Sequence, residues 1–188
     1  MEKPKLLIIE SAPAGGKSSV SRYIREHLPN TTLLDLGSLS HDTVVSSYLY
    51  HVSILNLFLE LRGTGSNIVS SRSFITNEVY YRLGKKDYIN SANYHYLCEK
   101  LSLLSIYYDV TVVILATNRE EYEKRLIERG KKTEYIKYSA DESMKQQRIY
   151  LEIADELREK GIRVITITNN TGTSMERSAN LIIDMISD

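Results

Sequence analysis

The stretch that decides the fold of this chain is LLIIESAPAGGKS, which spans residues 6–18. Residues 6–9 form an apolar run that is typical of a strand buried on both faces of a sheet. A loop of small residues follows, and Lys17 and Ser18 open a segment whose apolar residues recur at helical spacing. Strand, glycine-containing loop and helix in this order indicate a phosphate-binding P-loop, in which backbone N–H groups and the positive end of the helix bind an anion.

The loop sequence predicts a bound nucleoside triphosphate, ATP, together with Mg²⁺. Lys17 is expected to reach the β- and γ-phosphates, and the Ser18 hydroxyl is expected to ligate the metal. The match to the pattern G-x-x-x-x-G-K-[ST] is imperfect, because Ser11 stands where the pattern has glycine. The alternative is an ordinary strand-turn-helix corner with a chance Gly-Lys-Ser. The residues expected to line the nucleotide are Ser11, Ala12, Pro13, Ala14, Gly15, Gly16, Lys17, Ser18 and Ser19.

Length and composition narrow the class of protein. The chain has 188 residues, which fits a single domain, 1–188, with a sizeable core. Its formal net charge is zero, so it offers no overall basic field for duplex nucleic acid. No apolar run approaches the roughly 18–20 residues of a membrane-spanning helix, and without a signal-peptide pattern we expect a cytoplasmic enzyme. Cys98 is the only cysteine, which excludes an intramolecular disulfide framework, and we expect a packed thiol.

Predicted strands alternate with predicted helices along the whole chain. Strands are expected at residues 6–9, 31–36, 67–70, 109–116 and 162–167, and helices after the loop, at 42–61, 91–107, 120–129 and 141–160, and at the C-terminus. Gly130 is expected to end the helix at 120–129. This alternation predicts right-handed crossovers and a three-layer α/β/α fold, with a five-stranded parallel sheet covered on both faces.

Polar residues follow several of these strands. Ligands bind parallel sheets at the carboxyl ends of the strands, so these residues are expected to meet at one edge although they are far apart in sequence. They are the loop at 11–18, Asp35, Arg72, residues 117–118 and the loop at 169–172.

Some of these residues belong to recognisable motifs. Glu10 immediately precedes the loop, and Arg72 follows the third predicted strand. Arg125 and Arg129 follow the fourth strand, and the run QRIYLEIA occupies residues 147–154. In this order the motifs resemble those of the thymidylate kinase and deoxynucleoside kinase family of P-loop kinases, over nearly the whole chain. The family carries an acid where this chain has Ser71. The resemblance implies a P-loop NTPase fold with a lid at approximately residues 125–142.

The resemblance also implies an activity, which is transfer of the γ-phosphoryl group of ATP to a small-molecule acceptor, a nucleoside monophosphate or a deoxynucleoside. Arg125 and Arg129 share a helix face and would close on the transferred phosphoryl group, the alternative being a solvated basic face. Arg72 would bind the acceptor through its planar guanidinium, unless it is a surface arginine. The loop that contains Asn170 would hold the adenine ring, unless it is a plain turn.

A hydroxyl acceptor would benefit from a carboxylate base. Because Ser71 replaces the acid of the family, the candidate bases are Asp35 and Glu10, and Glu10 is also a candidate metal ligand beside Ser18. A nucleotide acceptor needs a base less, because its phosphate is already an oxyanion. Ser71 therefore favours a monophosphate substrate, or else weak or divergent activity. Candidates for the acceptor's base pocket, each more often a core residue in such a pattern, are Tyr48, His51, Asn56, Phe58, Tyr80 and Tyr81.

The main hypothesis from the sequence is an ATP-dependent, thymidylate kinase-like nucleotide or nucleoside kinase. Helix-mediated dimers are common in the resembled family, which makes a homodimer an expectation for this chain. Two alternatives stay open: a P-loop kinase of another small molecule, and a nucleotide-binding module without phosphotransfer. Ser11 and Ser71 are the residues that favour the binding module.

Overall fold

The computed structural model describes residues 2–36, 44–84, 91–133, 139–170 and 175–187. The strands are β1 (Lys5–Ser11), β2 (Thr31–Asp35), β3 (Asn67–Ser71), β4 (Asp109–Ala116) and β5 (Arg163–Thr168). The helices are α1 (Lys17–His27), α2 (Val44–Leu61), α3 (Phe74–Arg82), α4 (Ser91–Leu103), α5 (Arg119–Thr133), α6 (Ala140–Glu159) and α7 (Met175–Ser187), with short 3-10 turns at Arg62–Thr64 and Leu104–Ile106.

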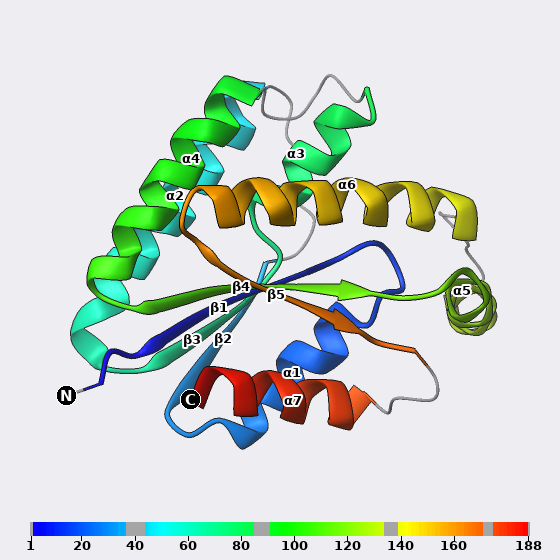
Figure 1. Ribbon diagram of the computed structural model, residues 1–188, viewed down its shortest axis with the longest axis horizontal. Coiled ribbons are helices and arrows are strands. Elements are labelled where there is room, and N and C mark those ends of the chain that lie inside the picture. Colours follow the sequence, from blue (N-terminus) through cyan, green and yellow to red (C-terminus); the bar gives the residue numbers. More distant parts are fainter. Residues whose placement is uncertain (1, 37–43, 85–90, 134–138, 171–174, 188) are drawn as a thin grey trace.

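The five strands form one parallel sheet with the order β2-β3-β1-β4-β5 (Figure 1). The strand β1 lies at the centre, between β3 and β4, and the chain leaves it at the point where the strand order reverses. Such a switch point is where parallel sheets bind ligands. The register pairs Asp35 with Ser71 and Ser71 with Ile9, so the carboxyl ends of β2, β3 and β1 lie next to one another.

Alternate residues of the central strand enter two separate hydrophobic cores. Leu6 and Ile8 pack with apolar residues of α2, α3, α4 and α6 on one face of the sheet. Leu7 and Ile9 pack with residues of α1 and α7 on the other face. Figure 1 shows this division, with α6 above the sheet and α1 and α7 below it. The continuous apolar run in β1 is explained by burial on both faces, as expected for a parallel sheet covered by helices.

The five predicted strands and their parallel arrangement are confirmed. The prediction that Gly130 ends a helix is wrong, because α5 continues through it to Thr133. Glycine inside a helix costs only about 1 kcal/mol relative to alanine, which the packing of buried Tyr122 and Leu126 on the same helix can offset. The predicted helix at 91–107 ends earlier, at Leu103, and continues as a 3-10 turn. Residues 42–43, 134–138 and 171–172, which the predicted helix, lid and loop include, lie outside the described residues.

The structure adds α3, which the sequence pattern did not predict. Ser73 caps this helix, since its hydroxyl accepts a hydrogen bond from the Ile75 N–H. Cys98 is buried in α4, and burial raises the pKa of its thiol to about 12, in agreement with the predicted packed thiol. Within the described residues, no helix combines the length and apolar character needed to cross a membrane.

Candidate functional site

The loop after β1 has the backbone conformation of a tight anion-binding turn. Ala14 and Gly16 both adopt positive φ, at 65° and 93°. The Gly15 N–H donates to the Ala12 carbonyl at 3.0 Å, which closes the turn. Helix α1 starts at Lys17, directly after the loop, so its positive end faces the space that the loop encloses. Ser18 and Ser19 lie exposed in the first turn of this helix.

Glu10 lies fully buried at the end of β1, directly before the loop. Its two carboxylate oxygens accept hydrogen bonds from the Ser73 hydroxyl at 2.7 Å and the Thr76 hydroxyl at 2.8 Å. Thr76 is also within 2.9 Å of the Tyr150 hydroxyl, which links the carboxylate to α6. The carboxylate is therefore held in one orientation by residues of α3 and its cap. The sequence does not single out Ser73, Thr76 or Tyr150, because the contacts from Glu10 to Ser73 and Thr76, and from Thr76 to Tyr150, each join segments more than sixty residues apart.

The charges at this edge of the sheet influence one another. Burial raises the pKa of the Glu10 carboxyl, while the nearby Lys17 ammonium, the two hydroxyls and Arg72 act in the opposite direction. Burial lowers the pKa of the Lys17 ammonium, and the positive charge of Arg72 lowers it further. The negative charges of Glu10 and Asp35 raise it. Each charged form is thus disfavoured by loss of water and stabilised by its oppositely charged neighbours, whereas Arg72 disfavours the charged form of Lys17. The structure brings together four residues that the sequence singled out separately.

Arg72 is held in a strained conformation at the end of β3. Its φ is 92°, in the region that favours glycine, and its N–H donates to the Ile9 carbonyl at 3.1 Å. Within the described part of the chain, its buried Nε atom has no hydrogen-bond partner, and neither has the buried Ser71 hydroxyl beside it. Buried polar atoms without partners are rare because each is costly, and strained residues cluster at ligand sites. Together these features make Arg72 a candidate ligand-binding residue.

Asp35 lies exposed at the end of β2 and pairs in register with Ser71. A carboxylate is therefore present one strand away from the position where the resembled family carries its acid. The influence of Asp35 on the pKa of Lys17 places the two charges within electrostatic reach. The prediction that Asp35 and Arg72 lie at the same edge as the loop is in agreement with this geometry.

The two arginines of α5 differ in their surroundings. Arg125 donates from Nε to Glu121 at 2.6 Å, from Nη1 to the Ala14 carbonyl at 3.3 Å, and from Nη2 to the Asn169 carbonyl at 2.7 Å. Arg129, one turn further along the helix, is exposed. The guanidinium of Arg125 thus contacts the backbone of the P-loop and of the residue that follows β5.

The loops after β4 and β5 are joined at the same edge. The Asn170 side chain accepts a hydrogen bond from the Asn118 N–H at 2.8 Å, and the Thr117 hydroxyl donates to the Asn169 carbonyl at 3.2 Å. Among the candidates for the acceptor's base pocket, Phe58 belongs to the hydrophobic core. His51 is buried as well, and Tyr81 is on the surface.

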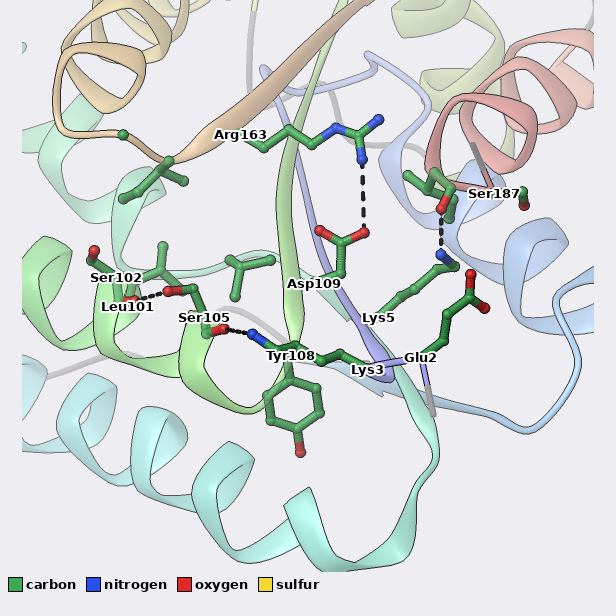
Figure 2. A pocket seen from close by; sticks show the side chains of 14 residues that line it. Glu2, Lys3, Lys5, Leu101, Ser102, Ser105, Tyr108, Asp109, Arg163 and Ser187 are labelled. Atoms are coloured by element: carbon green, nitrogen blue, oxygen red, sulfur yellow. Dashed lines mark hydrogen bonds and ion pairs between the residues drawn. The ribbon is translucent and has the colours of Figure 1, made fainter.

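A hollow of about 460 Å³ lies at the opposite edge of the sheet, where β1 and β4 begin. Figure 2 shows that its basic side chains are turned toward neighbouring protein groups. Lys3 donates to the Ser105 carbonyl, Lys5 donates to the Ile186 carbonyl at the end of α7, and Arg163 pairs with Asp109. The contact of Lys5 ties the end of α7 to β1, and none of the predicted site residues lines this hollow.

A parallel sheet of this order, with a tight glycine-containing loop between its central strand and the following helix, is the arrangement of the three-layer P-loop fold. Neither models of known protein families nor curated protein sequences give a match to the chain. Solved structures do match it.

The chain is similar to the YorR protein from Bacillus subtilis, solved with phosphorylated GDP, with a TM-score of 0.64, 19% identity, and coverage of 97% of this chain and 96% of that one. It is also similar to deoxyadenosine kinase from M. mycoides with bound dATP, at a TM-score of 0.61, 16% identity, and coverage of 97% and 100%. It is also similar to thymidylate kinase from Candida albicans, with a TM-score of 0.53, 17% identity, and coverage of 98% of this chain and 92% of that one. At these identities the similarity establishes the fold, and the predicted P-loop kinase fold is confirmed.

Proposed function

We propose that this protein is an ATP- and Mg²⁺-dependent phosphotransferase whose acceptor is a nucleoside monophosphate or a deoxynucleoside. The observation that carries the proposal is a pair of buried atoms, Arg72 Nε and Ser71 Oγ, that have no hydrogen-bond partner among the described residues and lie beside the charges of Glu10 and Lys17. An acceptor bound at Arg72 would lie next to a triphosphate bound in the loop. Phosphoryl transfer is catalysed mainly by such positioning and by neutralisation of charge.

The donor half of the proposed site consists of the loop and the start of α1. Backbone N–H groups of the loop and the positive end of the helix would hold the phosphates, with the Lys17 ammonium on the β- and γ-phosphates. The side chains present suit Mg²⁺, which prefers oxygen ligands, since the Ser18 hydroxyl is exposed and the Glu10 carboxylate has lone pairs beyond its two hydrogen bonds. The metal would neutralise charge on the phosphates.

The acceptor half of the proposed site consists of Arg72 and the neighbouring carboxylates. The guanidinium of Arg72 would donate to a phosphate or a hydroxyl of the acceptor. If the acceptor is a hydroxyl, Glu10 is a candidate general base, because a raised pKa brings a carboxylate closer to the working pH. Asp35 is the other candidate, on the neighbouring strand.

Other parts of the proposal rest on the sequence and on the similar structures. Deoxyadenosine kinase and thymidylate kinase are among those structures, which supports a nucleoside or nucleotide as the acceptor. Arg129 is proposed to approach the transferred phosphoryl group, and Asn170 to lie near the adenine ring. A lid near residues 125–142, a homodimer and a cytoplasmic location stay predictions.

The test is an assay of ADP release with ATP, Mg²⁺ and a panel of nucleosides and nucleoside monophosphates. We expect turnover that depends on one class of acceptor. Lys17→Ala should abolish this turnover, because it removes the charge that faces the phosphates. The matched control is Lys3→Ala, which removes an exposed lysine at the opposite edge and should leave turnover unchanged.

Absence of acceptor-dependent turnover with every member of the panel would contradict the proposed acceptor class. Binding of a non-hydrolysable ATP analogue in that case would favour the nucleotide-binding module. Turnover that survives in Lys17→Ala would contradict the assignment of the P-loop.

A further inference from the structure

Three consecutive carbonyl groups of the P-loop are each bonded to a side chain from a different element. The Pro13 carbonyl accepts from the Ser143 hydroxyl of α6 at 3.2 Å, and the Ala14 carbonyl accepts from Arg125 of α5 at 3.3 Å. The Gly15 carbonyl accepts from the Asn169 side chain, after β5, at 2.9 Å. We call Ser143, Arg125 and Asn169 the carbonyl clamp. Its members are far apart in the sequence and share no motif.

Asn169 is the most firmly held member of the clamp. It is 1% exposed, its side-chain oxygen accepts from the Ser178 hydroxyl at 3.2 Å, and its N–H donates to the Ala116 carbonyl at 2.7 Å. A Cβ atom added to Gly16 would lie only 2.4 Å from the Asn169 side-chain nitrogen. The glycine of the motif thus makes room for this contact, in addition to allowing positive φ.

Arg125 connects the other parts of the clamp. Its ion pair with Glu121, one turn earlier on α5, fixes the guanidinium at 2.6 Å. The remaining two nitrogen atoms donate to the Ala14 carbonyl and the Asn169 carbonyl. The planar guanidinium therefore holds the loop and the Asn169 backbone in a fixed relation. An ammonium group lacks this geometry.

The clamp has a consequence for the opposite side of the loop. In a trans peptide unit the carbonyl and the N–H of the next residue point in opposite directions. Because the carbonyls of Pro13 and Gly15 are bonded outward, the N–H groups of Ala14 and Gly16 point the other way, into the loop. Preorganised N–H groups cost no reordering when an anion binds, which raises affinity.

We infer that Asn169, Arg125 and Ser143 are positioning residues that preorganise the P-loop for the triphosphate. The inference rests on the proposed function, and it revises the expectation that Arg125 acts from the lid on the transferred phosphoryl group. The clamp contacts the P-loop at its backbone carbonyls, so we expect it to contribute to the affinity for phosphates, whatever base or acceptor is bound.

The test is calorimetric titration of the full chain with ATP and, separately, with inorganic tripolyphosphate, both with Mg²⁺. Asn169→Ala should raise the dissociation constants of both ligands by about tenfold, the factor expected for a buried hydrogen bond worth about 1.4 kcal/mol. Arg125→Lys should also weaken the binding of both ligands, although the positive charge at this position is kept. The matched control is Asn67→Ala, which removes an asparagine that also donates to a main-chain carbonyl, that of Pro29, at the opposite edge of the sheet.

Ser143→Ala provides a variant that keeps the fold intact, because it removes only one hydroxyl from a buried helical position. We expect this variant to raise the dissociation constants of both ligands by roughly threefold. In the turnover assay, the clamp variants should raise the KM for ATP more than they lower kcat, which a general loss of structure would not do.

The outcomes separate the two proposals. If the wild type binds both ligands and Asn169→Ala and Ser143→Ala bind them equally well, the clamp is wrong and the proposed function stands. If Arg125→Lys binds as tightly as the wild type, Arg125 acts only through its charge, which also contradicts the inference. If the wild type binds neither ligand, both the clamp and the proposed function are wrong.

Discussion

Ser11 shows how a single residue can depart from the P-loop pattern without disturbing the loop. A Cβ atom added to Gly15 would lie 2.7 Å from the Ser11 Cβ, closer than such atoms approach in proteins. The space that the side chain of Ser11 fills is therefore left open by Gly15. Ser11 replaces the glycine of the pattern on one side of the loop, and Gly15 on the other side provides the space that the serine needs. Ser11 thus gives no structural reason to doubt the anion-binding conformation.

Arg72 is the residue at which function and stability are expected to conflict. Its φ of 92° is strained for arginine, and its buried Nε lacks a partner in the described residues. Glycine adopts this φ without strain, and Arg72→Gly also removes the unpartnered atom. We expect the variant to melt at the same temperature as the wild type or higher. Its kcat/KM for the acceptor should fall by about 100-fold, as expected for loss of a positioned charge-stabilising donor, while its affinity for ATP is kept.

The measurements are thermal melts, calorimetry with ATP and turnover with the best acceptor. The control is Arg62→Ala, an exposed arginine in the 3-10 turn after α2, which should change none of the three. An Arg72→Gly variant that turns over normally would remove Arg72 from the acceptor site. One that unfolds would show that Arg72 has a structural role instead.

At the scale of helices and strands, local patterns were informative and long-range contacts were not. The strands were predictable because each is an apolar run bounded by turn residues. The end of α5 is not predictable in this way, because glycine is typical of a helix end, whereas α5 continues past Gly130 and packs through Tyr122 and Leu126. Helix α3 was missed because it is buried on nearly all sides and lacks an amphipathic pattern.

An ion pair between helices α3 and α6 provides a test at this scale. The guanidinium of Arg82 bonds both oxygens of Glu156, at 2.7 and 2.8 Å, and also bonds Glu78. These hydrogen bonds lower the pKa of Glu156, while burial opposes them. A carboxyl with a lowered folded-state pKa stabilises the fold above its unfolded value, near 4.5 here, and the stabilisation is lost as the pH falls through the folded value.

Glu156→Gln should therefore reduce the free energy of unfolding at pH 7 by about 1 kcal/mol, a modest value because both side chains are partly exposed. The difference from the wild type should shrink as the pH falls below about 4.5. Urea unfolding of the variant and the wild type at several pH values measures this difference in the free energy of unfolding. Asp155→Asn is the control, because Asp155 forms an exposed pair within α6 and should have little effect. A difference that stays constant from pH 7 to pH 3 would contradict the role of the ion pair.

At the scale of the whole molecule, the strand order creates the candidate site. Because β3 lies between β1 and β2, Glu10, Arg72 and Asp35 end at one edge of the sheet. The sequence predicted that such residues would meet, since all follow strands, but strand order depends on how distant segments pack. The carbonyl clamp was unpredictable for the same reason. Ser143 carries no local signal, the loop at 169–172 does not reveal which contact Asn169 makes, and the P-loop partners of both residues lie more than 120 residues away.

The central claim is that the loop at residues 11–18 and Arg72 are the donor and acceptor halves of one phosphotransfer site. The most direct measurement is a crystal structure with Mg²⁺, a non-hydrolysable ATP analogue and the acceptor that gives the best turnover. We predict that the triphosphate lies in the loop against Lys17, and that the 5′ end of the acceptor lies within hydrogen-bond distance of Arg72 Nε and Ser71 Oγ. A triphosphate bound outside the loop, or an acceptor bound away from Arg72, would contradict the claim.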